Sequence, residues 1–143
     1  MWRLPHTNYM KTILAKIEKA KDGTYSVYAE NFDFSGMGKT LEAAKNDMIN
    51  QIAFFVETAK ETGYRFDSDL DGNYEIKYKF DVQELLSYYE GVLGNAALER
   101  LTGINQKQIW SYASGKSKPR KEQRLKIETA LHGLGNELLA VEL

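Results

Sequence analysis

The sequence predicts an α+β protein, in which a small antiparallel sheet with one long helix is followed by an all-α helix-turn-helix domain. Between residues 11 and 80, segments that alternate apolar and polar side chains surround one long amphipathic segment, as strands and a covering helix do. Beyond residue 94, the apolar positions, a turn glycine and a polar face agree with a helix-turn-helix and a further helix. We therefore divide the 143 residues into an extension at 1–9, an α+β domain at 10–80 and a helical domain at 81–143.

Three segments of the α+β domain have the pattern of regular strands. Residues 11–19 alternate apolar and polar side chains, with Leu14 as the one exception, which is typical of a half-buried strand. The Asp22-Gly23 pair is a strong signal for a hairpin turn, after which residues 24–30 form the returning strand. Residues 74–80 alternate again and supply a further strand.

An irregular strand and the long helix lie between these segments. Residues 32–38 predict the irregular strand, in which Gly36 and Gly38 permit a bulge or a close backbone approach. Thr40 would cap the helix, which runs to about Thr62. Its apolar stripe consists of Leu41, Ala44, Met48, Ile52, Phe55 and Ala59.

The helical domain opens with residues 82–93, a helix capped by Asp81. A short helix at 95–101 follows, and Gly103 then supplies a tight turn because glycine enters positive φ at little cost. Ile104 would fill the angle between this helix and the next, and Asn105 would cap the next one.

The helix after Asn105 has the pattern of a recognition helix. It would bury Ile109 and Tyr112 on one face and leave polar side chains near its start, as base reading in the major groove requires. We predict that Gln106, Lys107 and Ser111 read bases, and that Asn95, at the start of the preceding helix, binds a phosphate. The cations predicted to lie along the DNA backbone are Lys116, Lys118, Arg120 and Lys121.

Gly115 ends this helix, and Pro119 precedes one more packed helix. Its predicted packed residues are Leu125, Ile127, Ala130 and Leu131. Trp110 falls between the buried and exposed faces, and packing against this last helix is favoured over contact with DNA. The end of the chain either forms a dimer seam or closes the core of its own domain, through Leu138, Leu139, Val141 and Leu143.

Charge is unevenly distributed along the chain, although the net charge is only −1. Residues 95–127 contain eight cations and two anions, a net charge of +6, whereas residues 29–94 contain thirteen anions and six cations, a net charge of −7. A basic segment attracts phosphates through counterion release, and an acidic one repels them. The basic segment therefore suits nucleic acid, and the acidic segment suits either solvent or a basic partner.

Enzymatic chemistry and cofactors are not expected. Two-metal phosphoryl transfer needs carboxylates that converge on ions about 4 Å apart, and nothing in the pattern forces Glu18, Asp22, Glu30 and Asp33 together. Residues 67–72 match the opening half of an EF-hand loop, but Tyr78 occupies the position of the closing glutamate, so a turn is the favoured interpretation.

Cysteine is absent, which excludes disulfides and thiolate metal sites and fits a reducing compartment. No apolar run approaches the roughly 20 residues that span a bilayer, and residues 1–9 lack the apolar core of a signal peptide. We expect a cytoplasmic protein with no membrane contact.

Taken together, residues 10–143 resemble the HicB-type antitoxins. The strand–hairpin–strand start leads into the segment SGMGKTLEAAKND, which is similar to the family's strand-turn-helix junction at Tyr28, Gly38, Thr40, Leu41, Glu42 and Ala44. The later part resembles the repressor-type helix-turn-helix at Leu98, Thr102, Gly103, Ile104, Ile109, Gly115 and Pro119. The chain departs from the pattern twice, with Asn31-Phe32 in place of a common Pro-Asp pair and with Glu99 where alanine is usual.

The resemblance implies a degenerate, inactive RNase H-like domain that masks a small basic toxin, HicA, which cleaves RNA. It also implies that the C-terminal domain binds the operator, a double-stranded DNA, and represses the pair. Masking would be steric and electrostatic, and we predict that Glu30 and Asp33 lie near the toxin-binding surface. A homodimer or higher homo-oligomer would read two half-sites about 34 Å apart.

Two alternatives stay open. The chain could be a stand-alone transcriptional regulator whose first domain senses a small molecule or a protein. It could also be a metal-dependent RNA-cleaving enzyme, whose activity would depend on Glu18, Glu30 or Asp33.

Overall fold

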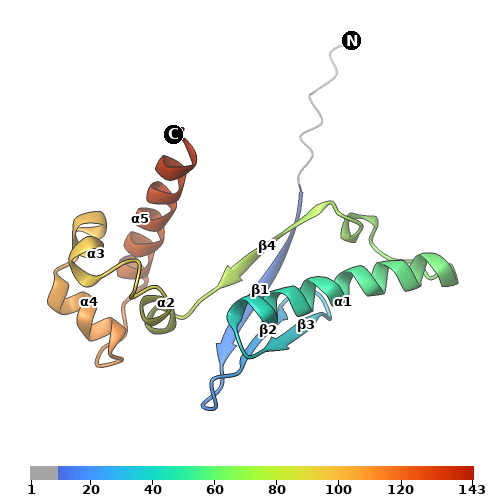
Figure 1. The fold of residues 1–143 in the computed structure, drawn as a ribbon, viewed down its shortest axis with the longest axis horizontal. Coiled ribbons are helices and arrows are strands. Elements are labelled where there is room, and N and C mark those ends of the chain that lie inside the picture. The colour runs from blue at the N-terminus through green and yellow to red at the C-terminus, as the bar shows by residue number, and fades with distance from the viewer. Residues whose placement is uncertain (1–9) are drawn as a thin grey trace, which may run out of the picture. The chain divides into compact units, whose positions relative to one another are not determined.

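A computed structural model describes residues 10–143, so the extension predicted at residues 1–9 lies outside the described residues. The described chain is α+β, with a four-stranded mixed sheet and five α-helices (Figure 1). It divides into two compact units, the first ending at Phe80 and the second beginning at Asp81. None of the helices within residues 10–143 is long and apolar enough to cross a membrane.

The sheet contains β1 (Lys11–Lys19), β2 (Tyr25–Ala29), β3 (Ser35–Gly38) and β4 (Tyr74–Lys79), in the order β3-β2-β1-β4. The pairs β1–β2 and β2–β3 are antiparallel, but β4 is parallel to β1, so the prediction of an antiparallel sheet is wrong. The cause is α1 (Leu41–Thr62), which connects β3 to β4 at the opposite edge. A crossover of this length can return the chain in the parallel direction, which a short hairpin cannot do.

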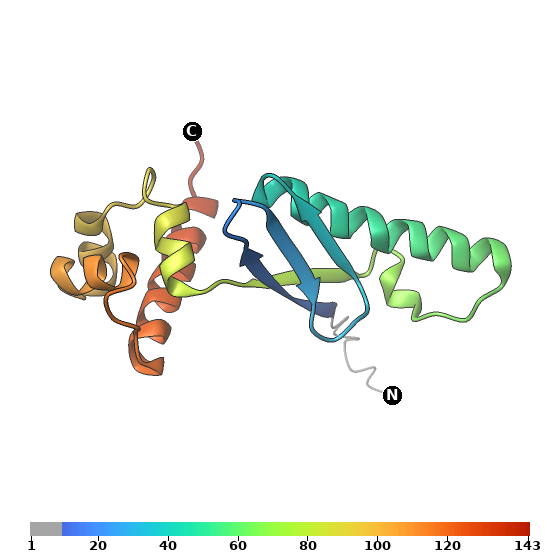
Figure 2. The same cartoon turned by 90° about the horizontal axis from the view of Figure 1, so that it is seen from below.

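Helix α1 lies along one face of the sheet (Figures 1 and 2). The Thr40 hydroxyl accepts the Ala43 N–H at 3.0 Å, and Gly63 ends the helix in the left-handed region at φ +70°. The predicted stripe is confirmed except at Phe55, which is half-buried and contacts the rings of Phe34 and Phe66 edge-on, while Val56 is buried in its place. With 3.6 residues per turn, positions 55 and 56 both fall on the side of α1 that faces the sheet, and the smaller side chain, Val56, is the buried one.

Strand β3 makes a close contact with α1. A Cβ atom at Gly36 would overlap the backbone of Ala44 and Met48, which confirms the predicted close approach. The strand is shorter than predicted, because it begins at Ser35 instead of residue 32. Phe32 and Phe34 instead stack on each other, with ring centroids 6.2 Å apart, and pack against the core of the unit.

The second unit consists of α2 (Val82–Tyr88), α3 (Asn95–Thr102), α4 (Gln106–Ala113) and α5 (Lys121–Leu139). The predicted helix at 82–93 ends early, at Tyr88, and the segment up to the start of α3 contains Gly91 and Gly94. Glycine is unfavourable inside a helix. The core of this unit is formed by Leu86, Leu98, Ile104, Ile109, Tyr112 and Ile127.

Helix α5 confirms three of its four predicted packed residues. Ile127 is buried, and Ala130 and Leu131 are half-buried, but Leu125 is 50% exposed. Two residues correspond to about 200° around a helix, so Leu125 and Ile127 cannot face the same core.

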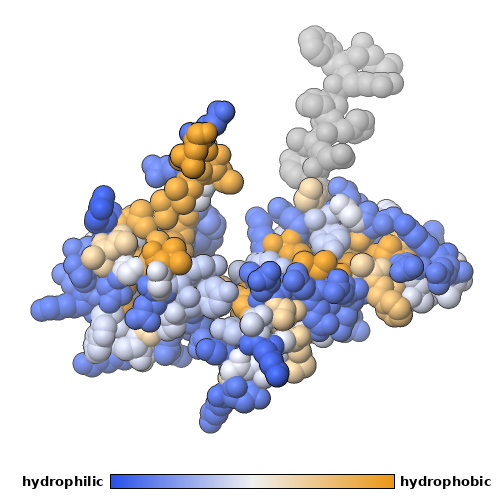
Figure 3. Space-filling model, in the orientation of Figure 1, coloured by the Kyte–Doolittle hydropathy of each residue, from blue (hydrophilic) through white to orange (hydrophobic). Residues whose placement is uncertain are grey.

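The end of the chain is exposed. Figure 3 shows hydrophobic colour gathered at the C-terminal end of α5. Leu138 is 61% exposed and Leu139 is 86% exposed, and Val141 and Leu143 are exposed as well. The interpretation that these side chains close the core of their own domain is therefore wrong.

Candidate nucleic-acid interface

The corner between α3 and α4 forms as its sequence predicts. Gly103 ends α3 at φ +75°, and its N–H donates to the Glu99 carbonyl at 2.8 Å. Ile104 is buried between the helices. The Asn105 side chain accepts the Lys107 N–H at 2.8 Å and so caps α4. These local contacts fix the start of α4 relative to α3.

Glu99 has a role that sequence reasoning missed. Its carboxylate accepts the Gln106 N–H at 2.6 Å, so two of the free N–H groups in the first turn of α4 bind side chains. The residue belongs to α3 but caps α4 across the corner, seven positions along the chain. No local sequence signal indicates this cap, because Glu99 lies on a different helix from the N–H group that it binds.

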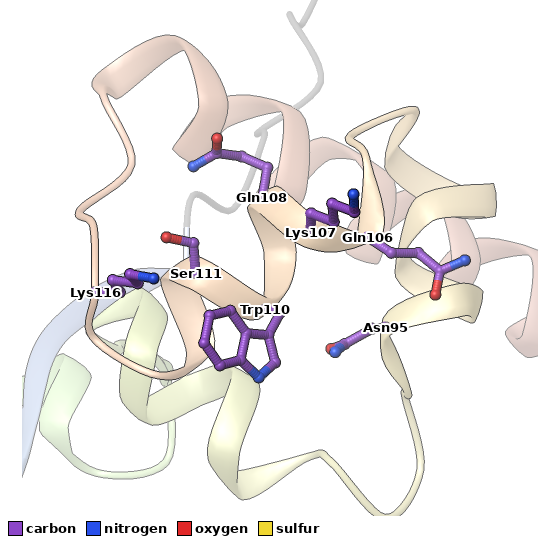
Figure 4. A pocket seen from close by; sticks show the side chains of 7 residues that line it. All are labelled: Asn95, Gln106, Lys107, Gln108, Trp110, Ser111 and Lys116. Carbon is purple, nitrogen blue, oxygen red and sulfur yellow. The ribbon is translucent and has the colours of Figure 1, made fainter.

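A concavity of about 660 Å³ lies on the exposed side of α4 (Figure 4). It brings together five of the eight residues predicted to bind DNA, namely Asn95, Gln106, Lys107, Ser111 and Lys116. Gln108 and Trp110 complete the lining. The lining thus contains two cations, three amide side chains and no acidic residue.

The other three predicted backbone contacts do not line this concavity. Lys118 and Arg120 lie in the turn before α5, and Lys121 is the first residue of α5. All three side chains are exposed. They extend the cationic surface beyond the concavity without forming part of it.

Ser111 is less free than the sequence indicates. It is half-buried, and its Oγ lies 2.8 Å from Ser117 Oγ. Gln108 Nε2 also donates to Ser117 Oγ, at 3.2 Å. The serine pair joins α4 to the segment before α5, and Gln108, which the sequence interpretation left out, holds that connection from the same helix.

Trp110 is on the surface, so the favoured interpretation that it packs against the last helix is wrong. Its side chain is 52% exposed, and it lies outside the core of the unit. The ammonium group of Lys116 lies 5.5 Å from the centroid of the indole ring. The tryptophan and this lysine therefore form one surface feature inside the concavity.

The comparisons with known proteins give no relatives. No protein-family model, curated protein or solved structure matches this chain.

The carboxylates predicted to contact a toxin lie on the connection from β2 to β3. Glu30 and Asp33 are both exposed and lie on either side of the half-buried Phe32. The backbone N–H of Glu30 donates to the Leu14 carbonyl at 2.7 Å, which ties this connection to β1.

The aspartate-rich loop at 67–72, expected as a turn, contains a short 3₁₀ helix, η1 (Ser68–Leu70), followed by a turn at residues 71–72. The Lys11 ammonium donates to Asp67 at 2.6 Å, which lowers the pKa of the Asp67 carboxyl and raises that of Lys11. Asp71 pairs with Lys60 at 2.5 Å. Two of the three aspartates thus bind lysines, and within residues 10–143 no group of three or more histidine, aspartate or glutamate side chains could hold a metal ion.

Proposed function

We propose that the chain is a HicB-type antitoxin, which masks a small basic RNA-cleaving toxin and represses its own operon by binding operator DNA. The observation that carries this proposal is the basic, amide-lined concavity at the start of α4, where predicted base readers and a predicted phosphate contact lie together. The proposal assigns no catalysis and no cofactor to the chain.

The DNA half of the proposal treats α3 and α4 as a helix-turn-helix. With α4 in the major groove, the Gln106 amide would bond adenine and the Lys107 ammonium would bond guanine. Asn95 and Lys116 would contact phosphates on either side, and Lys118, Arg120 and Lys121 would follow the backbone. Capping by Glu99 and Asn105 supports this role, because fixed helix starts hold base-reading side chains in register.

The toxin half rests on local charge. Residues 1–80 carry twelve anions and eleven cations, a net charge of −1. The first unit is nearly neutral because part of the acidic segment at 29–94 belongs to the second unit, and because the first hairpin is rich in lysine. The net charge of the first unit therefore does not attract a basic toxin by itself. We place the contact at the exposed Glu30 and Asp33, in a domain that we propose to be a degenerate RNase H-like fold.

The first experiment is a gel shift with the DNA upstream of the chain's own gene, at two salt concentrations. The intact chain should bind with an affinity that falls as salt rises, and the double variant Gln106→Ala, Lys107→Ala should lose the specific complex. A matched control is Lys77→Ala, which removes an exposed cation from β4 and should bind like the intact chain. Failure of the intact chain to bind this DNA would contradict the DNA half.

A second experiment tests the partner. The chain should capture the small basic product of the neighbouring gene, and the double variant Glu30→Lys, Asp33→Lys should lose that capture. Unchanged capture by the variant would remove these two residues from the proposal. If no such neighbouring gene exists while operator binding holds, the chain is a stand-alone helix-turn-helix regulator.

A further inference from the structure

Trp110 is a large apolar side chain that the second unit leaves on its surface. At 52% exposure it contributes little to the core, yet it lies inside the only part of α4 where the proposed DNA-binding residues meet. We infer that Trp110 is a further DNA contact, whose indole packs against the sugar–phosphate backbone of the strand that Asn95 binds. This inference rests on the proposed function, since it requires α4 to enter the major groove.

The position of Trp110 on α4 favours the backbone over the bases. It follows Gln106 by four residues, so the two side chains lie on the same side of the helix. Figure 4 shows the indole between Asn95, which begins α3, and Lys116, which follows α4. Two of the three proposed readers, Gln106 and Lys107, occupy the first turn of α4, which enters the groove first. A side chain one turn later, between two proposed phosphate contacts, meets the wall of the groove.

The chemistry of the indole fits that position. Its flat face can cover the apolar side of a deoxyribose, and its Nε1–H is a donor that can bond a phosphate oxygen. The Lys116 ammonium, 5.5 Å from the ring centroid, adds a positive charge beside the same phosphates. Tryptophan and lysine together therefore offer apolar contact, a hydrogen bond and charge to one stretch of backbone.

The experiment compares Trp110→Phe and Trp110→Ala in a Trp2→Phe background for binding to operator and to unrelated duplexes. We expect Trp110→Ala to weaken both complexes by a similar factor, on the order of tenfold, and Trp110→Phe to weaken them less. With Trp2 replaced, the chain retains one tryptophan at position 110, and operator DNA should change its fluorescence in the parent chain. The thermal midpoint of each variant should match that of the parent, because Trp110 lies outside the core.

The outcomes separate this inference from the proposed function. If Trp110→Ala binds like its parent while Gln106→Ala, Lys107→Ala loses binding, the tryptophan contact is wrong and the DNA-binding proposal stands. If Trp110→Ala loses discrimination at one base pair but keeps its affinity for unrelated DNA, Trp110 reads a base and the backbone contact is overturned. If the parent chain binds no DNA, both proposals fall together.

Discussion

At position 36, β3 and α1 approach so closely that a side chain has no room. Substitution Gly36→Ala should destabilise the first unit by about 1–3 kcal/mol, because the new Cβ would force the backbone of α1 away from the strand. Gly133→Ala is the matched control, since a Cβ in that part of α5 meets no atom within 4 Å. The control should stabilise by roughly 0.5–1 kcal/mol. Urea denaturation measures both, and equal midpoints for the two variants would contradict the close approach.

Glu99 provides the second residue-scale prediction. Glu99→Ala should destabilise this chain by about 0.5–2 kcal/mol, because the Gln106 N–H loses its acceptor. Glu128→Ala is a suitable control, because that exposed carboxylate on α5 caps nothing. Denaturation of the second unit gives the comparison, and a gain in stability for Glu99→Ala would show that the cap has no effect.

The Lys11–Asp67 pair makes stability depend on pH. The pKa of Asp67 is lowered by Lys11, so its contribution is complete above the ordinary carboxyl pKa of 3.8 and is lost as pH falls through the lowered value. The pKa of Lys11 is raised, so its contribution is complete below 10.5 and is lost as pH rises through the raised value. Lys11→Met should therefore lower the thermal midpoint between pH 3.8 and pH 10.5. As the pH falls below 3.8, the difference in thermal midpoint between the variant and the parent should shrink.

A lysine elsewhere in the sheet provides the control for this pH profile. Lys79→Met removes an exposed cation from β4 that takes part in none of the ion pairs within residues 10–143. Its midpoint should follow that of the parent at every pH. A Lys11→Met profile that runs parallel to the parent's down to strongly acidic pH would show that the pair contributes no stability.

At the scale of elements, local sequence pattern predicts the type and approximate position of the strands and α-helices, although β3 begins three residues later and α2 ends five residues earlier than predicted. The alternation of β1 predicts its full range, and Thr40 and Gly63 delimit α1 as their chemistry requires. Pairing does not follow from such patterns, because β1 and β4 are about sixty residues apart and either edge of the sheet suits an alternating strand. The parallel direction of β4 is a property of the crossover through α1, which local periodicity does not encode.

In the candidate interface, too, features that depend on neighbours in the sequence are predictable, and features that depend on packing between helices are not. Gly103, Ile104 and Asn105 are predictable because each acts on its neighbours along the chain. The Glu99 cap joins two helices across a corner, and the exposure of Trp110 depends on where α5 packs. A helical wheel places Trp110 between two faces, so only the packed unit decides which face it joins.

At the scale of the whole molecule, the exposed end of α5 is where we place the contact of the expected homodimer. Ile127, Leu131, Leu134 and Leu138 follow one another at four, three and four residues, which is the spacing of a coiled-coil seam. Along this line burial decreases, from the buried Ile127 to Leu138 at 61% exposure. The apolar stripe of α5 thus extends beyond the core of its own unit. In a dimer, the exposed part of this stripe could pack against the same part of a second copy.

A polar substitution at the end of that stripe tests the dimer. Leu138→Glu should convert a dimer to a monomer in sedimentation experiments and weaken operator binding, since each monomer then reads one half-site without its partner. Leu125→Glu is the matched control, because that exposed leucine lies on the opposite side of the helix from Leu138. It should leave the mass unchanged. If the parent is already monomeric, or if Leu138→Glu stays dimeric, the copies associate elsewhere or not at all, and the exposed leucines of α5 serve another partner.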